Sequence, residues 1–181
     1  MENPIAAWHE EHVYFGQLLG LLKKELDVFH SGARPNYGLM LDVISYFRDY
    51  SDQFHHPREN VAFDILAKRC PELQLELARL KQEHRVIANA GDALHKFLSA
   101  AVEDAFIRRD EIEMAAATYL VYYGNHIAKE EEDVLSLAAK TLTPQDWAQV
   151  KAAVAPVRDP LFGEHPAERY RELRRQIALE A

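Results

Sequence analysis

Two short stretches of the chain repeat one pattern: residues 55–59 read His-His-Pro-Arg-Glu, and residues 126–130 read His-Ile-Ala-Lys-Glu. In each stretch a histidine stands four positions before a glutamate. Residues at this separation lie one above the other on the same face of an α-helix. If both stretches are helical, each one directs an imidazole and a carboxylate toward a common point.

The sequence around these stretches predicts four long helices. Pro4 opens the first, Asn36 can cap the second, Pro71 opens the third and Asp110 caps the fourth. Behind each start, apolar residues recur at steps of three and four, which is the spacing of one buried helix face. Because short connections join the four segments, we expect an all-α, up-down-up-down antiparallel four-helix bundle.

Polar residues interrupt these apolar stripes at similar depths. The first and third helices carry one histidine each, whereas the second and fourth carry the histidine–glutamate pairs. At about 1.5 Å per residue, all of them fall in one layer of an antiparallel bundle. The converging residues are His12, His55, Glu59, His84, His126 and Glu130. Two carboxylates in an apolar core are costly unless they are protonated or paired, so we expect a bound cation.

The kind of cation follows from the donor set. A set that includes two carboxylates and exceeds four donors suits a pair of iron or manganese ions in a helix bundle. Zinc is the weaker alternative because it prefers four ligands. A third interpretation is a helical interaction module whose polar layer is satisfied without any metal.

Composition excludes several other functions. The chain has 181 residues, with 21 Lys and Arg against 29 Asp and Glu and a net charge of −8. This acidic balance argues against nucleic-acid binding, which depends on Lys and Arg. The longest apolar run, residues 114–123, is about half of the roughly 20 residues that a membrane-spanning helix needs. A single cysteine, Cys70, excludes a disulfide scaffold and fits a reducing cytoplasm.

In order and spacing, the six converging residues resemble the hemerythrin-like, or HHE cation-binding, family. The resemblance covers the chain from about residue 5 to residue 140 and implies a bundle around a non-haem di-iron centre. It implies that the four histidines are terminal ligands. Glu59 and Glu130 would then bridge two irons, together with an oxo or hydroxo group.

The chain departs from the oxygen carriers of that family on the third helix. Those proteins have a second histidine four residues after the first, whereas His84 is followed by Arg85-Val86-Ile87-Ala88. The acid of the fourth helix also follows its histidine by four residues rather than five. The version of the family that matches is associated with repair of iron–sulfur clusters under nitrosative stress and with sensing of iron or oxygen.

The missing histidine affects the expected chemistry. The protein would supply about eight of roughly twelve coordination positions on two ions, and a bridging oxygen about two more, so we expect one open position on each iron. We therefore predict a protein that binds or senses a small ligand such as O2, NO or peroxide. The alternative is a redox or repair protein that turns over peroxide or NO or donates iron. Whether the protein is an enzyme stays open.

Several residues near the predicted centre carry further expectations. Tyr122 lies one turn before His126 and is predicted to hydrogen-bond an iron ligand or a bound small molecule. Pro57 predicts an irregularity in the second helix. His56 is expected at the surface, about 100° around the helix from His55. A solvated rim is expected from Glu11, Arg58, Lys129, Glu131 and Glu132.

We expect two parts in the chain: the di-iron bundle in residues 1–140 and a helical extension, packed on or near it, in residues 141–181. The extension contains Thr143-Pro144-Gln145-Asp146, which predicts a capped helix start, and a charged helix near its end. No segment resembles a kinase, a cyclase or a DNA-binding domain, so a sensor would signal to a separate protein partner. The oligomeric state stays open.

Overall fold

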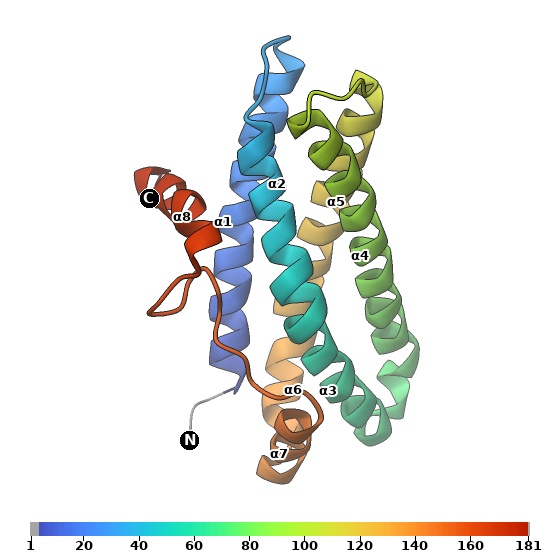
Figure 1. Cartoon of the computed structure of the whole chain (residues 1–181). Coiled ribbons are helices and arrows are strands. Elements are labelled where there is room, and N and C mark those ends of the chain that lie inside the picture. Colours follow the sequence, from blue (N-terminus) through green and yellow to red (C-terminus); the bar gives the residue numbers. More distant parts are fainter. Residues whose placement is uncertain (1–3, 181) are drawn as a thin grey trace.

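Four long helical stretches run alternately up and down, side by side (Figure 1). The computed structural model describes residues 4–180, and this part of the chain contains helices and connections but no strand. The predicted all-α bundle is confirmed. In chain order the stretches are α1 (Pro4–His30); α2 (Tyr37–Tyr46), η1 (Phe47–His55) and α3 (His56–Arg69); η2 (Pro71–Leu73) and α4 (Gln74–Val102); and α5 (Arg109–Lys129), η3 (Glu130–Val134) and α6 (Leu135–Thr141).

The chain after the bundle packs against its outer surface. α7 (Pro144–Ala153) contacts α3, and the chain then runs back along the bundle to η4 (Glu168–Tyr170) and α8 (Arg171–Glu180), as Figure 1 shows. α8 contacts α1 and α2. Leu161 and Leu173 are fully buried and belong to the same apolar cluster as residues of α1 and α2, so this segment completes the core.

Of the five predicted starts of helical stretches, those at Pro4, Asn36, Pro71 and Thr143 are correct and the one at Asp110 is wrong. The Asn36 side chain caps α2 by accepting a hydrogen bond from a backbone N–H, and Thr143 forms a capping box with Asp146 at the start of α7. Asp110 does not cap α5, which begins one residue earlier. Its carboxylate pairs instead with the guanidinium of Arg108, the residue in the N-cap position.

The second helical stretch contains a π-helical segment, η1, that ends directly before α3. Pro57 has no N–H, and in a regular α-helix its ring clashes with the carbonyl four residues earlier. In a π-helix each N–H reaches the carbonyl five residues earlier, as the N–H of His56 does to Ser51. The irregularity expected from Pro57 therefore takes the form of a wider turn, through which the helix continues (Figure 1).

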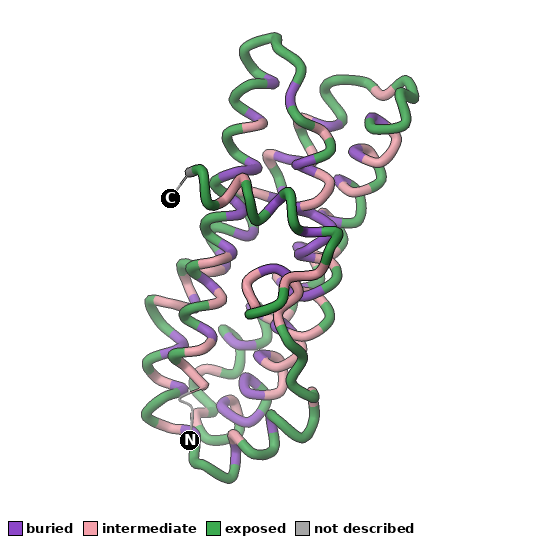
Figure 2. The backbone as a smooth tube through the Cα atoms, turned by 60° about the vertical axis from the view of Figure 1, so that its left-hand side comes forward, coloured by how far each residue is buried: buried purple, intermediate pink, exposed green. Residues whose placement is uncertain are grey.

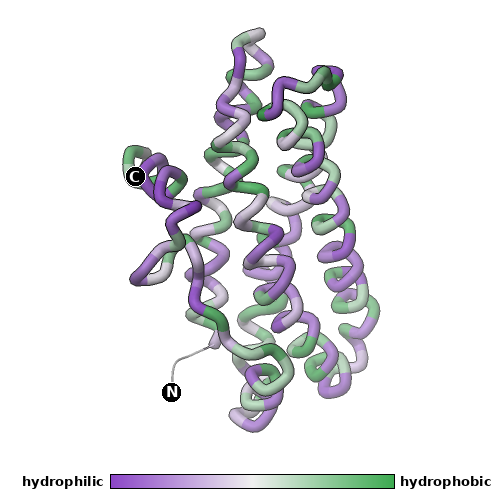
Figure 3. The backbone as a smooth tube through the Cα atoms, in the orientation of Figure 1, coloured by the Kyte–Doolittle hydropathy of each residue, from purple (hydrophilic) through white to green (hydrophobic). Residues whose placement is uncertain are grey.

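The core consists of two apolar clusters separated by a polar layer. On α1 the boundary falls between Trp8 and Phe15, and on α4 it falls between Leu80 and Ile87. Figure 2 shows buried residues recurring along each helix, and Figure 3 shows hydrophilic residues interleaved with hydrophobic ones. None of the described helices is long and apolar enough to cross a membrane. The boundary positions on the helices bring their polar residues to one level.

Candidate metal centre

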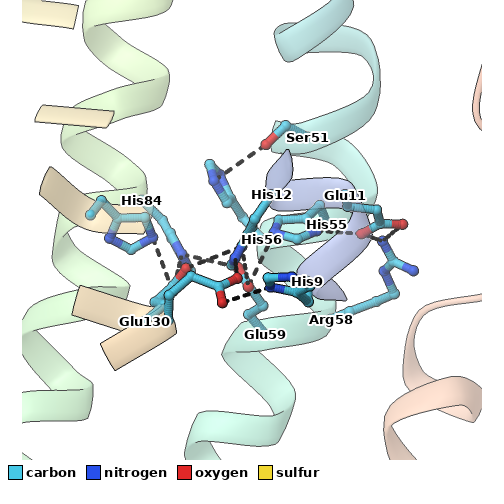
Figure 4. A network of polar contacts seen from close by, with 12 residues as sticks. His9, Glu11, His12, Ser51, His55, His56, Arg58, Glu59, His84 and Glu130 are labelled. Atoms are coloured by element: carbon cyan, nitrogen blue, oxygen red, sulfur yellow. Dashed lines mark hydrogen bonds and ion pairs between the residues drawn. The ribbon is translucent and has the colours of Figure 1, made fainter. Parts of the chain in front are cut away.

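The polar layer brings the six converging residues together inside the bundle, with all six side chains buried. Figure 4 labels all of them except His126. The residues form two pairs of histidines with two glutamates between them. His12 and His55 form the first pair, with their Nε2 atoms 3.0 Å apart. His84 and His126 form the second pair, with ring centroids 4.5 Å apart. The layer predicted from helix lengths is therefore present.

Each glutamate faces both histidine pairs. Oε1 of Glu59 lies 3.1 Å from Nε2 of His55, whereas its Oε2 lies 3.4 Å from Nε2 of His84. In the same way, Oε2 of Glu130 lies 3.5 Å from Nε2 of His12, and its Oε1 lies 3.5 Å from Nε2 of His84. One oxygen of each carboxylate thus points to each half of the centre.

The inward atoms of this centre are poorly satisfied by the protein itself. Both carboxylate oxygens of Glu59 and of Glu130, and Nε2 of His84 and of His126, are buried without a hydrogen-bond partner among the described residues. Such groups are rare in folded proteins and call for an explanation. Imidazole nitrogens and carboxylate oxygens together bind iron, manganese or zinc. The residues therefore fit a pair of cations, one in each half.

The histidines of the first pair are held from behind by carboxylates of neighbouring helices. Nδ1 of His55 donates to Glu11 of α1 at 2.5 Å, and Nδ1 of His12 donates to Glu131 of η3 at 2.7 Å. Arg58 in turn donates to Glu11 at 2.7 Å (Figure 4). An outer carboxylate of this kind fixes the ring and leaves Nε2 for a metal ion.

The histidines of the second pair are held in the same manner. Nδ1 of His84 donates to the side-chain oxygen of Asn60 on α3 at 3.0 Å, and Nδ1 of His126 donates to Glu83 on α4 at 3.2 Å. Lys129 donates to Glu83 at 2.6 Å. The histidines of the second, third and fourth helical stretches are thus each bonded to the preceding stretch. The histidine of the first stretch is bonded to the fourth stretch. These contacts connect all four stretches around the centre.

Close approach of the two kinds of group changes their ionisation. Burial opposes the charged form of Glu59, but the surrounding histidines outweigh it and lower its pKa well below the usual value. Burial likewise opposes the cationic form of His55, but Glu59 and Glu11 raise its pKa to about 10. The nearby carboxylates of Glu130 and Glu59 similarly outweigh burial and raise the pKa of His84 to about 9. In the absence of a cation, protons on these histidines balance the carboxylates.

His56 is buried, with 3% of its surface exposed, so the predicted surface position is wrong. Its ring stacks on that of His84 with centroids 4.1 Å apart, its Nδ1 lies 3.2 Å from Asp52, and its Nε2 lies 3.3 Å from Oγ of Ser51. Burial lowers its pKa well below the usual value. The prediction failed because the second helical stretch has a neighbour on each side: His55 bonds to Glu11 of α1, and His56 stacks on His84 of α4.

The expectation that Tyr122 lies beside the centre is also wrong, because this side chain is 47% exposed. Tyr123 is buried instead, with its hydroxyl bonded to Ser51 and its ring 5.5 Å from that of His56. On α5 the buried residue before His126 is Tyr123, three positions earlier, and not Tyr122, four positions earlier. Both separations lie on one helix face, so the spacing alone could not decide between the two tyrosines.

Sequence reasoning missed the outer partners of the histidines. The prediction of a solvated rim is correct for Glu132, which is exposed, but the other members of that rim bond to the histidines or to their carboxylate partners. The sequence did contain an indication of these partners, because each of them is adjacent to an inward residue. Such a position lies at the edge of the buried helix face, next to the neighbouring helix. These partners are Glu11, Asn60, Glu83 and Glu131.

The fold and the buried donor set define a cation-binding helical bundle. Comparison with models of protein families matches residues 3–138 to the hemerythrin HHE cation binding domain. The match spans most of the chain, and the protein belongs to this family, whose domain has a cation-binding function, typically for iron. Searches among curated proteins and among solved structures found no match.

Proposed function

We propose that the protein holds two iron ions and binds or senses a small ligand, such as O2, NO or peroxide, at that pair. The inward histidines would each bind one ion through Nε2, and Glu59 and Glu130 would bridge the ions. The observation that carries the proposal is the orientation of Glu59, whose two oxygens face His55 and His84 on opposite sides. The iron pair, when bound, supplies the redox and ligand-binding chemistry.

The protein's own contribution is a preorganised and dry site. Outer hydrogen bonds hold each imidazole with Nε2 directed inward, so little ordering is needed when a cation binds. Apolar residues close the layer from both sides: the ring of Phe15 lies 4.8 Å from that of His55, and the ring of Phe63 lies 6.0 Å from that of His84. Exclusion of water strengthens electrostatic interactions between the ions and their ligands.

Charge favours an anionic or polarisable ligand. Two divalent ions against Glu59 and Glu130, with neutral histidines, leave an excess of about two positive charges inside an apolar core. Such an excess is reduced when an anion binds. The outer carboxylates Glu11 and Glu83 are already paired with Arg58 and Lys129 and do little to offset it, whereas Glu131, beside His12, offsets part of it.

Iron quantification and an optical spectrum of the purified protein test the proposal. We expect about two irons per chain, with near-ultraviolet charge-transfer bands. In His55→Ala the iron content should fall, whereas the matched control His165→Ala, which changes an exposed histidine, should keep it. A folded protein without metal, or with a single zinc, would contradict the proposal.

A second measurement separates ligand binding from turnover. Peroxide or NO is added to the reduced protein, and the spectrum and the products are followed. A stable adduct that forms once per protein and is reversed on removal of the ligand supports binding or sensing. Repeated consumption of peroxide or NO supports the redox or repair alternative instead.

A further inference from the structure

His56 resembles the four inward histidines in the kind of group that lies beside its Nδ1. Each of those has Nδ1 bonded to an outer group and Nε2 toward the interior. Beside Nδ1 of His56 lies the carboxylate of Asp52, at 3.2 Å but without the geometry of a hydrogen bond. At Nε2 His56 has only a long contact of 3.3 Å to the hydroxyl of Ser51. That hydroxyl is also bonded to Tyr123 and would keep this partner if His56 turned away.

The position of His56 relates it to the second histidine pair. One of its ring nitrogens lies within 4.8 Å of donor atoms of Glu59, His84 and His126. Its ring centroid is 4.1 Å from that of His84 and 5.9 Å from that of His126. The rings of the two inward pairs meet edge to face with centroids 4.9 Å and 4.5 Å apart, whereas the ring of His56 lies parallel to that of His84 and must turn before its Nε2 can face the same cation.

We propose that His56 is a fifth histidine ligand, which binds the cation held by His84 and His126 by exchanging its contact with Ser51 for that cation. This inference rests on the proposed function, because it assumes one cation in each half. The two halves would then differ, with three imidazoles on one cation and two on the other. α3 would supply the ligand that the third helix lacks after His84.

The unequal distribution changes where an external ligand binds. With the added imidazole the protein supplies about nine of roughly twelve coordination positions, and a bridging oxygen about two more. The remaining open position belongs to the cation of His12 and His55. The sequence-based expectation of an open position on each ion is then replaced by a single binding position, on the side of α1.

Titration with Co(II), followed by calorimetry and visible absorption, tests the role of His56. The metal-free wild type should bind two Co(II) ions per chain. His56→Phe, which keeps a ring to stack on His84, should bind one ion as before and the other at least about 10-fold more weakly. Azide added to the loaded proteins should bind once per chain in the wild type and twice in the variant at saturating Co(II).

Two further variants separate ligation from packing. Ser51→Ala removes the alternative partner of His56 and should leave Co(II) binding unchanged or tighter. His56→Glu restores a ligand without an imidazole and should recover the weakened ion. If Ser51→Ala weakens Co(II) binding as much as His56→Phe does, or if His56→Phe binds both ions and one azide like the wild type, the ligand assignment is wrong. A wild type that binds fewer than two ions contradicts the two-cation function itself.

Discussion

Nδ1 of His55 lies 2.5 Å from a carboxylate oxygen of Glu11, a residue whose sequence neighbour, His12, points into the centre. α1 therefore contributes both an inward imidazole and the group that orients the imidazole of the next helical stretch. The same relationship recurs on α4, where Glu83 precedes His84 and bonds to His126. In each case one residue supplies an inward imidazole, and the residue before it orients the imidazole of the next helical stretch.

Loss of one outer carboxylate should weaken one cation more than the other. In Glu11→Gln, the charge that orients His55 is removed, and affinity for the ion of the first pair should fall about 10- to 100-fold. Glu83→Gln should have the corresponding effect on the ion of the second pair. The matched control is Glu10→Gln, because Glu10 is exposed and bonds to Tyr14. Calorimetric metal titration measures each affinity, and equal weakening of both ions by Glu11→Gln would contradict the assignment.

Removal of a bridging carboxylate should affect both cations. Glu59→Ala deletes a group that faces His55 on one side and His84 on the other, so metal content should fall from about two ions per chain toward zero. Elemental analysis after dialysis measures this content. Glu132→Ala changes an exposed glutamate near Glu130 and serves as the control. Loss of a single ion in Glu59→Ala would show that Glu59 does not bridge.

Cation binding should release protons, and affinity should rise with pH. In the cation-free protein the pKa values of His55 and His84 are about 10 and about 9, so both rings are doubly protonated and cationic at neutral pH. A metal ion binds the neutral imidazole and displaces one of these protons. Calorimetry in buffers of different ionisation enthalpy should therefore show proton release at pH 7. Binding without proton release would contradict these pKa values.

The same shifts determine how the cation-free protein responds to alkali. A histidine whose pKa is raised on folding contributes stability that is complete below its unfolded value, near 6.5. That contribution is lost as the pH rises through the folded values of about 9 and about 10. The free energy of unfolding of the metal-free protein should therefore decrease between pH 7 and pH 10. Chemical denaturation at several pH values measures it, and an increase over this range would overturn the prediction.

Tyr123, rather than Tyr122, should contribute to stability through its hydroxyl. Tyr123→Phe removes a buried hydrogen bond to Ser51 and should lower the free energy of unfolding by about 1 kcal/mol. Tyr122→Phe changes an exposed residue and should alter it by less than about 0.5 kcal/mol. Denaturant titration of the two variants compares them directly, and the reverse order would place the wrong tyrosine in the core.

The segment after α7 should stabilise the bundle. Leu173 is fully buried against the core, whereas Leu179 on the same helix is 71% exposed. Leu173→Ala should lower the free energy of unfolding by about 2 to 5 kcal/mol because it leaves a cavity in a packed interior. Leu179→Ala should change it by less than about 0.5 kcal/mol. Equal effects of the two substitutions would mean that α8 is not packed on the bundle.

The sequence predicted the helices and the inward residues because both depend on spacing along one helix. The step of four from His55 to Glu59, and the depths of His12 and His84 in their helices, follow from the rise of an α-helix alone. No knowledge of the neighbouring helix was needed. The agreement in depth among the four helices then indicated that these side chains meet.

The features that the sequence did not predict depend on how each helix is rotated against its neighbours. In the sequence nothing distinguishes Asn60 and Glu83 from other polar residues. Their role depends on the packed helices, in which Asn60 faces α4 and Glu83 faces α5. The surface position predicted for His56 assumes a regular α-helix with one neighbour, whereas its helical stretch contains a π-helical segment and has two neighbours. Tyr122 and Tyr123 differ by one position, and only the packed bundle decides which of them is buried.

The outer contacts of the histidines also have a mechanical consequence. Every helical stretch both carries an imidazole and holds the imidazole of the following stretch, so a small rotation of one helix moves two rings. Because the fourth stretch holds the ring of the first, these contacts form a closed circuit of four helices. Close packing of the interior leaves no gap in which the movement of one helix could be absorbed. A change in the radius of the bound ion would therefore affect the positions of all four helical stretches together.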